Sequence, residues 1–515
     1  MENVAHKDTV KKKVATGCIW GVAVVLLFQM SNSLFILWLL LFVAMSLSGT
    51  CTVRQMSLVD VIVGILWLYE GLQCFYTINE TTTVSFFRFS TLMLMVYVVL
   101  RKVLGNVRCY TLFLQTIFVL GSVAVMITLF SFGIFYQSAT DAGFTETYSL
   151  RFLFRPLGYN TNAWVTVLFA LMGCTLLVCP SRSVGKNLRL LLWGVLWVAL
   201  QLSFSRAAFI VLGLCFLSLF LLKEVWTEKL KLITVALVSV GVTTVCFPKE
   251  TIATLQMNHT VSQQRSTQGR INSAHAAWKV FGERKMLGTG AGTYIQCIDK
   301  EYFQNSNQSY SSYPPNWVMW VLVEKGIVGG VLYSILVLAV CITVWKGRRK
   351  RNSLYAGIIL ALLLLKEMSL WTTVTTPMTA FMFCALLALL QTDNSVKVFP
   401  LAKVNVPMHY FLIGLCLMVC LCTHYYFHRF DENRKIMEQA FVAFEKGHQE
   451  EAVSFIEELE NEMPWLINKG RFYMKCGQYR EAKETLAKAM ELQPEDVYVR
   501  FMYACTLLPT EKKEK

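Results

Sequence analysis

Thirteen long apolar runs between residues 15 and 427 constrain this chain more than any other feature. A helix needs about 20 mostly apolar residues to cross the hydrocarbon core of a bilayer. The runs lie near residues 15–31, 33–47, 57–75, 84–100, 109–134, 161–180, 188–203, 205–222, 232–247, 317–345, 353–371, 373–390 and 409–427. They predict an all-α fold, a polytopic membrane helical bundle of about 12–13 spans.

Composition excludes an ordinary soluble enzyme. Charged residues make up 16% of the 515-residue chain, whereas about 25% is typical of soluble domains. The net charge of +15 belongs to the apolar part, because residues 428–515 carry a net charge of −3. No basic stretch is interleaved with polar residues that would read a nucleic-acid groove. We therefore expect the basic residues to orient membrane helices, and we expect no nucleic-acid partner.

Lysine and arginine fall mainly on one side of the predicted helices. With the N-terminus in the cytoplasm, the cytoplasmic segments hold 21 basic residues and the short outer loops hold three, Arg151, Arg155 and Arg206. Basic loops resist translocation, so this asymmetry supports the orientation. Lysines 11–13 resemble the start of a signal peptide, but no small-residue cleavage site follows, so we expect a retained first helix. An odd number of spans places the C-terminal tail outside.

The chain divides into a membrane domain and a tail. Residues 1–427 form the predicted transmembrane domain, with two large outer loops at 135–160 and 248–316. Loops of that size in a compact protein are usually functional or disordered, and the second contains a predicted helix near 270–284. Residues 428–515 form a tail with helical spacing of apolar residues.

A motif recurs within the tail at an offset of 30 residues. The segment from Gly447 is followed by Pro464, and the segment from Gly477 by Pro494. The second copy resembles a tetratricopeptide repeat through Gly470, Tyr473, Gly477, Tyr479, Ala482, Leu486, Ala489 and Pro494. Such arrays normally need three or more units, so the resemblance implies that the tail leans on the membrane domain or on a protein partner.

The sixteen cysteines carry little functional signal. Most lie in apolar runs, where a thiol behaves as a small hydrophobic group, and none has metal-ligand spacing. Cys476 and Cys505 can meet if the tail faces an oxidising space. The outer loops contain no acidic pair at metal-binding spacing either, so we expect no metal and no cofactor.

Ionisable residues gather at the outer ends of the predicted spans, where they are costly and usually functional. They are Glu70, Arg88, Arg206, Glu324, Lys366 and Glu367, and the outer loops add Arg151, Arg155, Arg265, Arg270 and Arg284. One interpretation is internal pairing, of Glu70 with Arg88 or of Lys366 with a neighbouring carboxylate. The other is a metal-independent site for pyrophosphate, because arginine donates two parallel hydrogen bonds to phosphate and stays charged.

Four segments, in order along the chain, resemble motifs of the O-antigen ligase and polymerase superfamily. The Arg-Pro-x-Gly…Asn element is matched by Arg155, Pro156, Gly158, Asn160 and Asn162, and the Ser-Arg-Gly element by Ser205 and Arg206. The large outer loop is matched by Arg265, Gly269, Arg270, Trp278, Gly288, Gly290, Gly292 and Tyr294, and the following motif by Asn316, Glu324, Gly326 and Gly329. The resemblance covers roughly residues 135–390.

This resemblance implies a glycosyltransferase of the bacterial cytoplasmic membrane. Such enzymes pass a glycan from an undecaprenyl-pyrophosphate carrier to a lipid or glycan acceptor outside the cytoplasm. It implies that Arg206, Arg265 and Arg270 hold the pyrophosphate in catalysis and that Asn316 and Glu324 border the acceptor side. The expected substrate-binding residues are Arg151, Arg155, Asn162, His275, Gly288, Gly290, Gly292 and Asn316.

One position departs from the family pattern. Where the family has His-Asn, this chain has Pro315 followed by Asn316, and proline cannot act as a base. Glu324 is our first candidate for the missing base, because a carboxylate in an apolar setting can accept a proton from a sugar hydroxyl. His275 and Glu367 are the other candidates, and a member without activity is the remaining alternative.

Two other functions fit parts of the pattern. A transporter of lipid-linked glycans would also use arginines, but transporters place ionisable groups near the membrane midplane, often within repeated halves. A non-catalytic assembly scaffold would explain the missing histidine together with the repeats of the tail. Ligase and polymerase share the motifs and differ in acceptor.

Overall fold

The computed structural model describes residues 2–28, 34–48, 56–141, 154–178, 183–256, 261–298, 314–368, 376–394, 408–463, 465–493 and 497–507. Regular secondary structure in these ranges is entirely helical, which confirms the predicted all-α fold. The chain forms two compact units, Met1–Tyr294 with Ser309–Leu417 and Ile295–Gln308 with Met418–Lys515.

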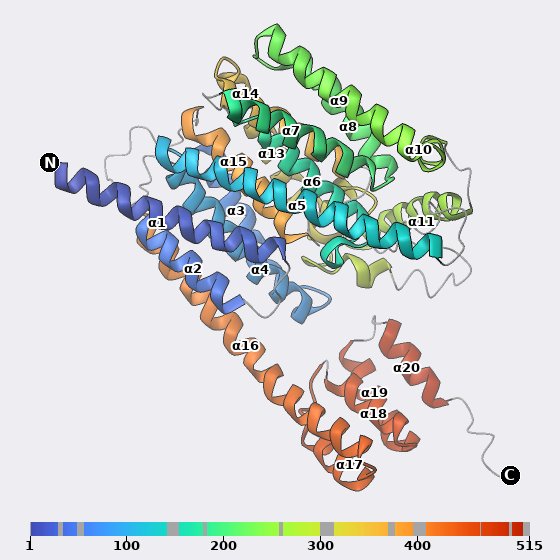
Figure 1. The fold of residues 1–515 in the computed structure, drawn as a ribbon. Coiled ribbons are helices and arrows are strands. Elements are labelled where there is room, and N and C mark those ends of the chain that lie inside the picture. Colours follow the sequence, from blue (N-terminus) through green and yellow to red (C-terminus); the bar gives the residue numbers. More distant parts are fainter. Residues whose placement is uncertain are drawn as a thin grey trace. The chain divides into compact units, whose positions relative to one another are not determined.

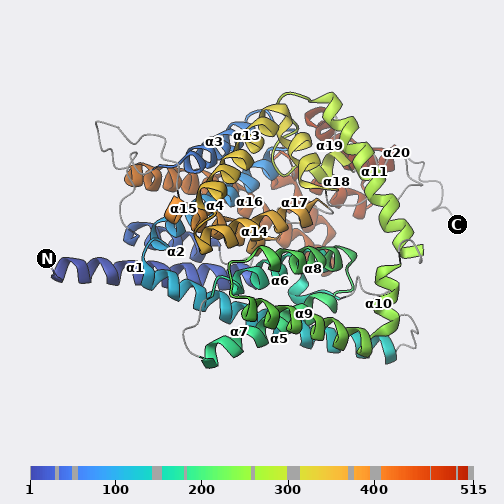
Figure 2. The same cartoon turned by 90° about the horizontal axis from the view of Figure 1, so that it is seen from above.

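The first unit is a bundle of apolar helices (Figures 1 and 2). In chain order they are α1 (Glu2–Leu27), α2 (Leu34–Leu47), α3 (Leu58–Gln73), α4 (Glu80–Val103), α5 (Val107–Asp141), α6 (Thr161–Thr175), α7 (Ser183–Gln201), α8 (Arg206–Ser218), α9 (Trp226–Cys246), α10 (Pro248–Leu255), α11 (Val261–Glu283), α13 (Trp317–Gly347), α14 (Arg351–Glu367), α15 (Pro377–Asn394) and the start of α16 (Met408–Glu445). Two short 3-10 helices, η4 (Pro156–Gly158) and η5 (Leu219–Leu221), flank α6 and α8. Every predicted span contains one of these helices.

Helix α6 lies inside the first unit. Its residues from Ala163 to Thr175 are all buried, and it packs against α5, α7, α14 and α15. A helix that is apolar on every side must be covered on every side, which explains this position. The indole N–H of Trp164 donates to Thr128 Oγ1 over 2.9 Å, so its polar atom is satisfied internally. Thr166, in the second turn of α6, is buried in the same interior.

Polar contacts tie together the helix ends that the sequence assigns to the cytoplasmic side. Arg351, which starts α14, forms a 2.7 Å ion pair with Glu224 and donates to the carbonyl of Leu176 over 2.8 Å. Arg189, near the start of α7, donates to the carbonyl of Val178 over 2.9 Å. The starts of α7 and α14 therefore lie beside the end of α6, in agreement with the predicted alternation of directions.

Five helices in the described residues are long and apolar enough to cross a membrane. They are α4, α5, α9, α13 and the part of α16 from Tyr410 to Glu445. Shorter apolar helices cover Ile36–Leu47, Thr161–Thr175, Arg206–Leu221 and Pro377–Gln391. These apolar helices make the chain a multi-pass membrane protein. The total of 12–13 membrane crossings stays a prediction.

Two elements differ in length from their predicted ranges. Helix α5 continues to Asp141, beyond the predicted end at residue 134. The extension is stabilised by aromatic packing, because Tyr136 lies 5.4 Å from Phe247, centroid to centroid. Helix α11 begins at Val261, earlier than the predicted helix near 270–284.

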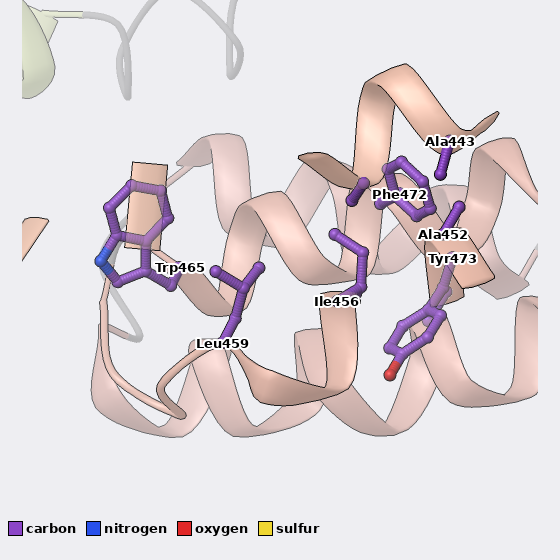
Figure 3. Packing of buried hydrophobic residues seen from close by; sticks show 9 residues of the cluster. Ala443, Ala452, Ile456, Leu459, Trp465, Phe472 and Tyr473 are labelled. Atoms are coloured by element: carbon purple, nitrogen blue, oxygen red, sulfur yellow. The ribbon is translucent and has the colours of Figure 1, made fainter. Parts of the chain in front are cut away.

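The second unit is built from helical hairpins at the C-terminal end of the chain. It contains the later part of α16 with α17 (Gln449–Glu458), α18 (Trp465–Lys475), α19 (Tyr479–Leu492) and α20 (Val497–Leu507). Figure 3 shows its core, in which Ala443, Ala452, Ile456, Leu459, Trp465, Phe472 and Tyr473 are buried.

Two helix ends in this unit are equivalent and lie 30 residues apart. Gly447 has φ 83° and Gly477 has φ 77°, the left-handed region in which glycine avoids the penalty of a Cβ atom. After each glycine, the next N–H donates to the carbonyl five residues earlier, over 3.0 Å from His448 and 2.9 Å from Gln478. The repeat predicted from the sequence therefore corresponds to two similar helix–turn–helix units.

Close helix packing explains the small residues of the repeat. A Cβ atom on Gly470 of α18 would lie 2.5 Å from Leu486 Cγ of α19, so a larger residue would push the two helices apart. The predicted closing residues Pro464 and Pro494 lie outside the described residues. Cys476 and Cys505 are free thiols, so the disulfide that the sequence allowed is not formed.

Candidate functional site

Helix α13 bends at Gly326, which has φ 62° and ψ −164°. In an unbroken helix, the N–H groups of Ile327 and Val328 would donate to carbonyls four residues earlier in α13. They donate instead to the carbonyls of Lys285 over 2.8 Å and Met286 over 3.2 Å. The bend therefore joins α13 to the glycine-rich segment, residues 285–294.

The same bend frees two carbonyl groups of α13, and the glycine-rich segment uses both. The carbonyl of Val323 accepts the N–H of Thr289 over 2.9 Å, and that of Glu324 accepts the N–H of Gly290 over 3.0 Å. The side-chain amide of Gln73 from α3 also donates to the Glu324 carbonyl, over 2.7 Å. Both carbonyl groups freed by the bend therefore have hydrogen-bond partners, as buried polar groups require.

Glycine is required where the two backbones cross. A Cβ atom on Gly288 would lie 2.4 Å from the carbonyl carbon of Glu324, and one on Gly326 would lie 2.4 Å from the carbonyl oxygen of Met286. Both glycines also have positive φ angles, of 76° and 62°. The glycine-rich segment is therefore a close-packed crossing against α13.

The Glu324 side chain completes this crossing. It is 1% exposed. Its Oε2 accepts the N–H of Gly292 over 2.9 Å, and its Oε1 accepts the N–H of Tyr294 over 3.2 Å. Glu324 thus has a structural role that the sequence did not predict, because its side chain holds the backbone of the glycine-rich segment. A carboxylate acceptor makes such hydrogen bonds stronger. Its role as the base stays a prediction.

Lys325 lies beside Glu324 in the sequence and is fully buried on the α3 and α4 side. Its Nζ atom lies 2.6 Å from Glu70 Oε1, and Ser90 donates to the other oxygen of Glu70. The ammonium group also lies 5.2 Å from the ring centres of both Phe86 and Trp320, within range of cation–π attraction. The sequence had offered Arg88 as a partner for Glu70, whereas the ion pair found here is with Lys325.

A second polar group, the arginine cluster, lies where the starts of α6 and α8 approach α11 and the end of α14. Its members are Asn162, Thr166, Ser205, Arg206, Thr267, Arg270, Lys366 and Glu367. Arg206 donates through Nη2 to Thr267 Oγ1 on α11 over 3.4 Å. Arg270, one helical turn further along α11, lies close enough to Lys366 for their positive charges to repel. Two arginines predicted from distant motifs thus share one cluster.

Asn162 connects α6 to the start of α8. The hydroxyl of Ser205 donates to Asn162 Oδ1 over 2.9 Å and makes no capping bond to α8. Phe204 has φ 43°, which is uncommon for an aromatic residue, and its ring is buried in an aromatic cluster. This turn places Arg206 at the N-terminus of α8, where the helix dipole favours an anion.

The end of α14 adds a buried ion pair to the arginine cluster. Lys366 Nζ lies 2.8 Å from Glu367 Oε1, and neither side chain is exposed to solvent. The prediction that Lys366 pairs with a neighbouring carboxylate is confirmed. Because this pair is neutral, Arg206 and Arg270 account for the net positive charge of the cluster, and both are only half-buried.

Comparison with protein families bears on these two sites. Residues 190–334 match the family described as O-antigen ligase. The chain carries an O-antigen ligase domain. Residues 466–496 match the tetratricopeptide repeat, in agreement with the hairpin of α18 and α19. The comparison with curated proteins found no match.

The O-antigen ligase match covers only part of the arginine cluster. It runs from α7 into α13 and includes Arg206, Arg270 and the glycine-rich segment. Asn162, Lys366 and Glu367 lie outside the matched residues, yet the fold brings them to the same place. The membrane helices α6 and α14 therefore complete a cluster that the O-antigen ligase domain begins.

Two predicted residues of α11 lie away from the cluster. Arg265 is exposed, and five residues along a helix correspond to a rotation of about 140°, so it faces away from Arg270. His275 is exposed as well. Their predicted roles as a phosphate ligand and a substrate contact stay predictions.

The remaining predicted residues are placed as follows. Asn316 is the N-cap of α13, and its Oδ1 accepts the N–H of Met319 over 2.8 Å. This bond explains asparagine at that position by helix capping. Arg155 is exposed in the turn before α6, and Pro315 is buried before α13. Arg151 lies outside the described residues.

Sequence reasoning did not select Lys325, Thr166 or Thr267. A signal existed for Lys325, because it is a charged residue inside an apolar run. Threonine is common on membrane helices and gives no such signal. In the part of the chain that the structure describes, no group of three or more His, Cys, Asp or Glu side chains is placed to hold a metal ion.

Proposed function

We propose that this protein transfers a glycan from an undecaprenyl-pyrophosphate carrier to a lipid or glycan acceptor at the outer face of the cytoplasmic membrane. The observation that carries the proposal is the arginine cluster, in which Arg206 of α8 donates to Thr267 of α11, and Arg270, three residues further along α11, interacts electrostatically with Lys366. The O-antigen ligase match supports the same class of reaction.

The arginine cluster suits a diphosphate. Two guanidinium groups match two phosphate groups, because each donates parallel hydrogen bonds to a pair of phosphate oxygens. The N-terminus of α8 adds its dipole at Arg206, and the Ser205 hydroxyl does not compete for the N–H groups there. The cluster is thus arranged to hold an anion at the end of the membrane helices.

The reaction breaks the bond between the sugar anomeric carbon and the pyrophosphate oxygen. The acceptor hydroxyl oxygen forms the new bond to that carbon and loses its proton, and the lipid pyrophosphate leaves with the bonding electron pair. Arg206 and Arg270 would stabilise the negative charge that develops on the leaving group. In this proposal the two arginines stabilise the leaving group without a metal ion, and Glu324 accepts the proton.

Each oxygen of Glu324 uses one lone pair for a backbone N–H group and retains another for a proton. In this proposal Asn316, at the start of α13, borders the acceptor side. Ligase and polymerase activity both fit, because they differ in the acceptor. The tail would lie outside the cytoplasm and bind a protein partner through its tetratricopeptide repeat.

Transfer by membranes supplied with lipid-linked oligosaccharide tests this proposal. We expect Arg206→Ala and Arg270→Ala each to slow glycan transfer by about 100-fold or more, because a charge-stabilising donor is lost. Arg348→Ala is a matched control, since Arg348 is exposed at the C-terminal end of α13 and stacks on Trp345. The control should retain full transfer.

Unchanged transfer by both cluster variants, at normal protein levels, would overturn the pyrophosphate assignment. Detergent-solubilised protein separates the alternatives. A transferase remains active when donor and acceptor are mixed with it in detergent, whereas a transporter or a scaffold forms no product there.

A further inference from the structure

Lys366 and Glu367 are adjacent residues at the end of α14, and both side chains are withdrawn from solvent. Their charged atoms lie 2.8 Å apart, and each side chain has 0% exposure. Consecutive residues on a helix point about 100° apart, so this contact requires both side chains to turn toward each other. Apolar residues of similar size often stabilise a protein interior as well as a buried ion pair does, or better. The pair therefore calls for a reason other than stability.

The Thr166 hydroxyl of α6 contacts both charged groups. Lys366 donates to Thr166 Oγ1, and that hydroxyl lies 3.1 Å from Glu367 Oε1 and 3.1 Å from the carbonyl oxygen of Asn162. The ion pair is thereby fixed to α6 at Thr166, one helical turn after Asn162.

A hydrogen bond from Ser205 to Asn162 connects α6 to the segment that carries Arg206. Asn162 Oδ1 accepts the hydroxyl of Ser205, the residue directly before Arg206. Arg206 donates to Thr267 on α11, and the positive charge of Arg270 on the same helix repels that of Lys366. Hydrogen bonds thus link α14 to α6, α6 to the start of α8, and α8 to α11, and the charge of Arg270 on α11 acts on Lys366 of α14.

We propose that Lys366 and Glu367 are a positioning pair, which holds Arg206 and Arg270 in place for a diphosphate and keeps the net charge of the cluster at two positive charges. This inference rests on the proposed function. The two residues lie outside the O-antigen ligase match. They act through the arginines and are themselves buried away from solvent.

The double variant Lys366→Met/Glu367→Leu tests the pair without leaving an unpaired buried charge. Apolar replacement of a whole buried ion pair is often neutral for stability, so we expect the protein level and the Tm in detergent to stay close to wild type. We expect kcat for glycan transfer to fall about 10-fold to 100-fold, because misplaced binding groups lose alignment. The donor KM should change much less, because the net charge of the cluster is unchanged.

Lys366→Met alone should raise the donor KM by about tenfold, because the remaining carboxylate repels the diphosphate. A merely structural pair would not change KM in this direction. Thr166→Val is a milder variant that removes only the hydroxyl between the pair and Asn162. It should lower kcat while Tm falls little, and it keeps the test valid if the charged variants do not fold.

The matched control is the ion pair at the other end of the same helix. Arg351 and Glu224 lie 2.7 Å apart, and Glu224→Gln should leave transfer kinetics unchanged. Wild-type kcat in the double variant and in Thr166→Val would overturn the positioning role. If Arg206→Ala also transferred normally, the proposed function itself would fail, whereas an inactive Arg206→Ala beside a fully active double variant would remove only this inference.

Discussion

The carboxylate of Glu324 accepts the backbone N–H of Gly292 across a distance of 2.9 Å. The second oxygen accepts the N–H of Tyr294, so one buried side chain fixes the turn that follows α11. The bend at Gly326 lies two residues further along α13 and binds the same segment through backbone groups. Side chain and backbone of α13 together hold the glycine-rich segment in place.

Glu324→Gln separates the structural role of this residue from its predicted role as a base. Glutamine offers one acceptor oxygen where the carboxylate offers two, so we expect Tm to fall and the free energy of unfolding to drop by about 1–3 kcal/mol. Transfer should fall with it. Lost transfer at an unchanged Tm would assign Glu324 to proton transfer alone, and full activity at a normal Tm would contradict both roles.

Gly326→Ala should destabilise the crossing of α13 with the glycine-rich segment. The new Cβ atom would lie 2.4 Å from the Met286 carbonyl oxygen, at a φ angle of 62° that alanine rarely adopts. We expect a loss of about 1–3 kcal/mol, measured as Tm in detergent. Gly330→Ala is the control in the same helix, because its Cβ would make only an ordinary 3.4 Å contact with Leu322. Equal Tm values for the two variants would contradict the crossing.

The sequence allowed the helices and much of the arginine cluster to be predicted, for physical reasons. The length of each apolar run predicts a membrane helix directly. Arg206, Arg270 and Asn162 could be selected because each belongs to a different sequence motif. Lys366 stood out because charges inside apolar runs are costly. The fold then brought these four residues from distant parts of the chain to one place.

Partners and bends were harder to predict. Glu70 pairs with Lys325 through a separation of 255 residues, and no local spacing reports such a contact. The bend at Gly326 follows from a close crossing of two backbones, which becomes visible only when both segments are placed. The outward direction of Arg265 likewise depends on which face of α11 packs against the bundle.

Arg265 and Arg270 provide a comparison within one helix. Both were predicted to hold pyrophosphate, but Arg265 is exposed, whereas Arg270 is half-buried and its charge acts on Lys366 in the arginine cluster. We expect Arg270→Ala to slow glycan transfer by about 100-fold or more and Arg265→Ala to slow it much less. Equal losses would show that both faces of α11 contact the substrate.

Cysteine labelling tests the predicted sides of the membrane. Ser454 is exposed on α17, and Lys346 is exposed near the end of α13. In intact cells, an impermeant thiol reagent should label the Ser454→Cys variant above the level of the parent protein. The Lys346→Cys variant should be labelled only after lysis. The opposite pattern would invert the orientation, and labelling of both from outside would contradict the predicted number of spans.

Binding of the carrier lipid tests the central claim most directly. Purified wild-type protein should bind undecaprenyl pyrophosphate more tightly than undecaprenyl monophosphate, because the arginine cluster presents two guanidinium groups to two phosphates. Arg206→Ala and Arg270→Ala should each weaken pyrophosphate binding by about tenfold or more and affect the monophosphate less. Equal affinity of the wild type for both lipids, unchanged in either variant, would contradict the account.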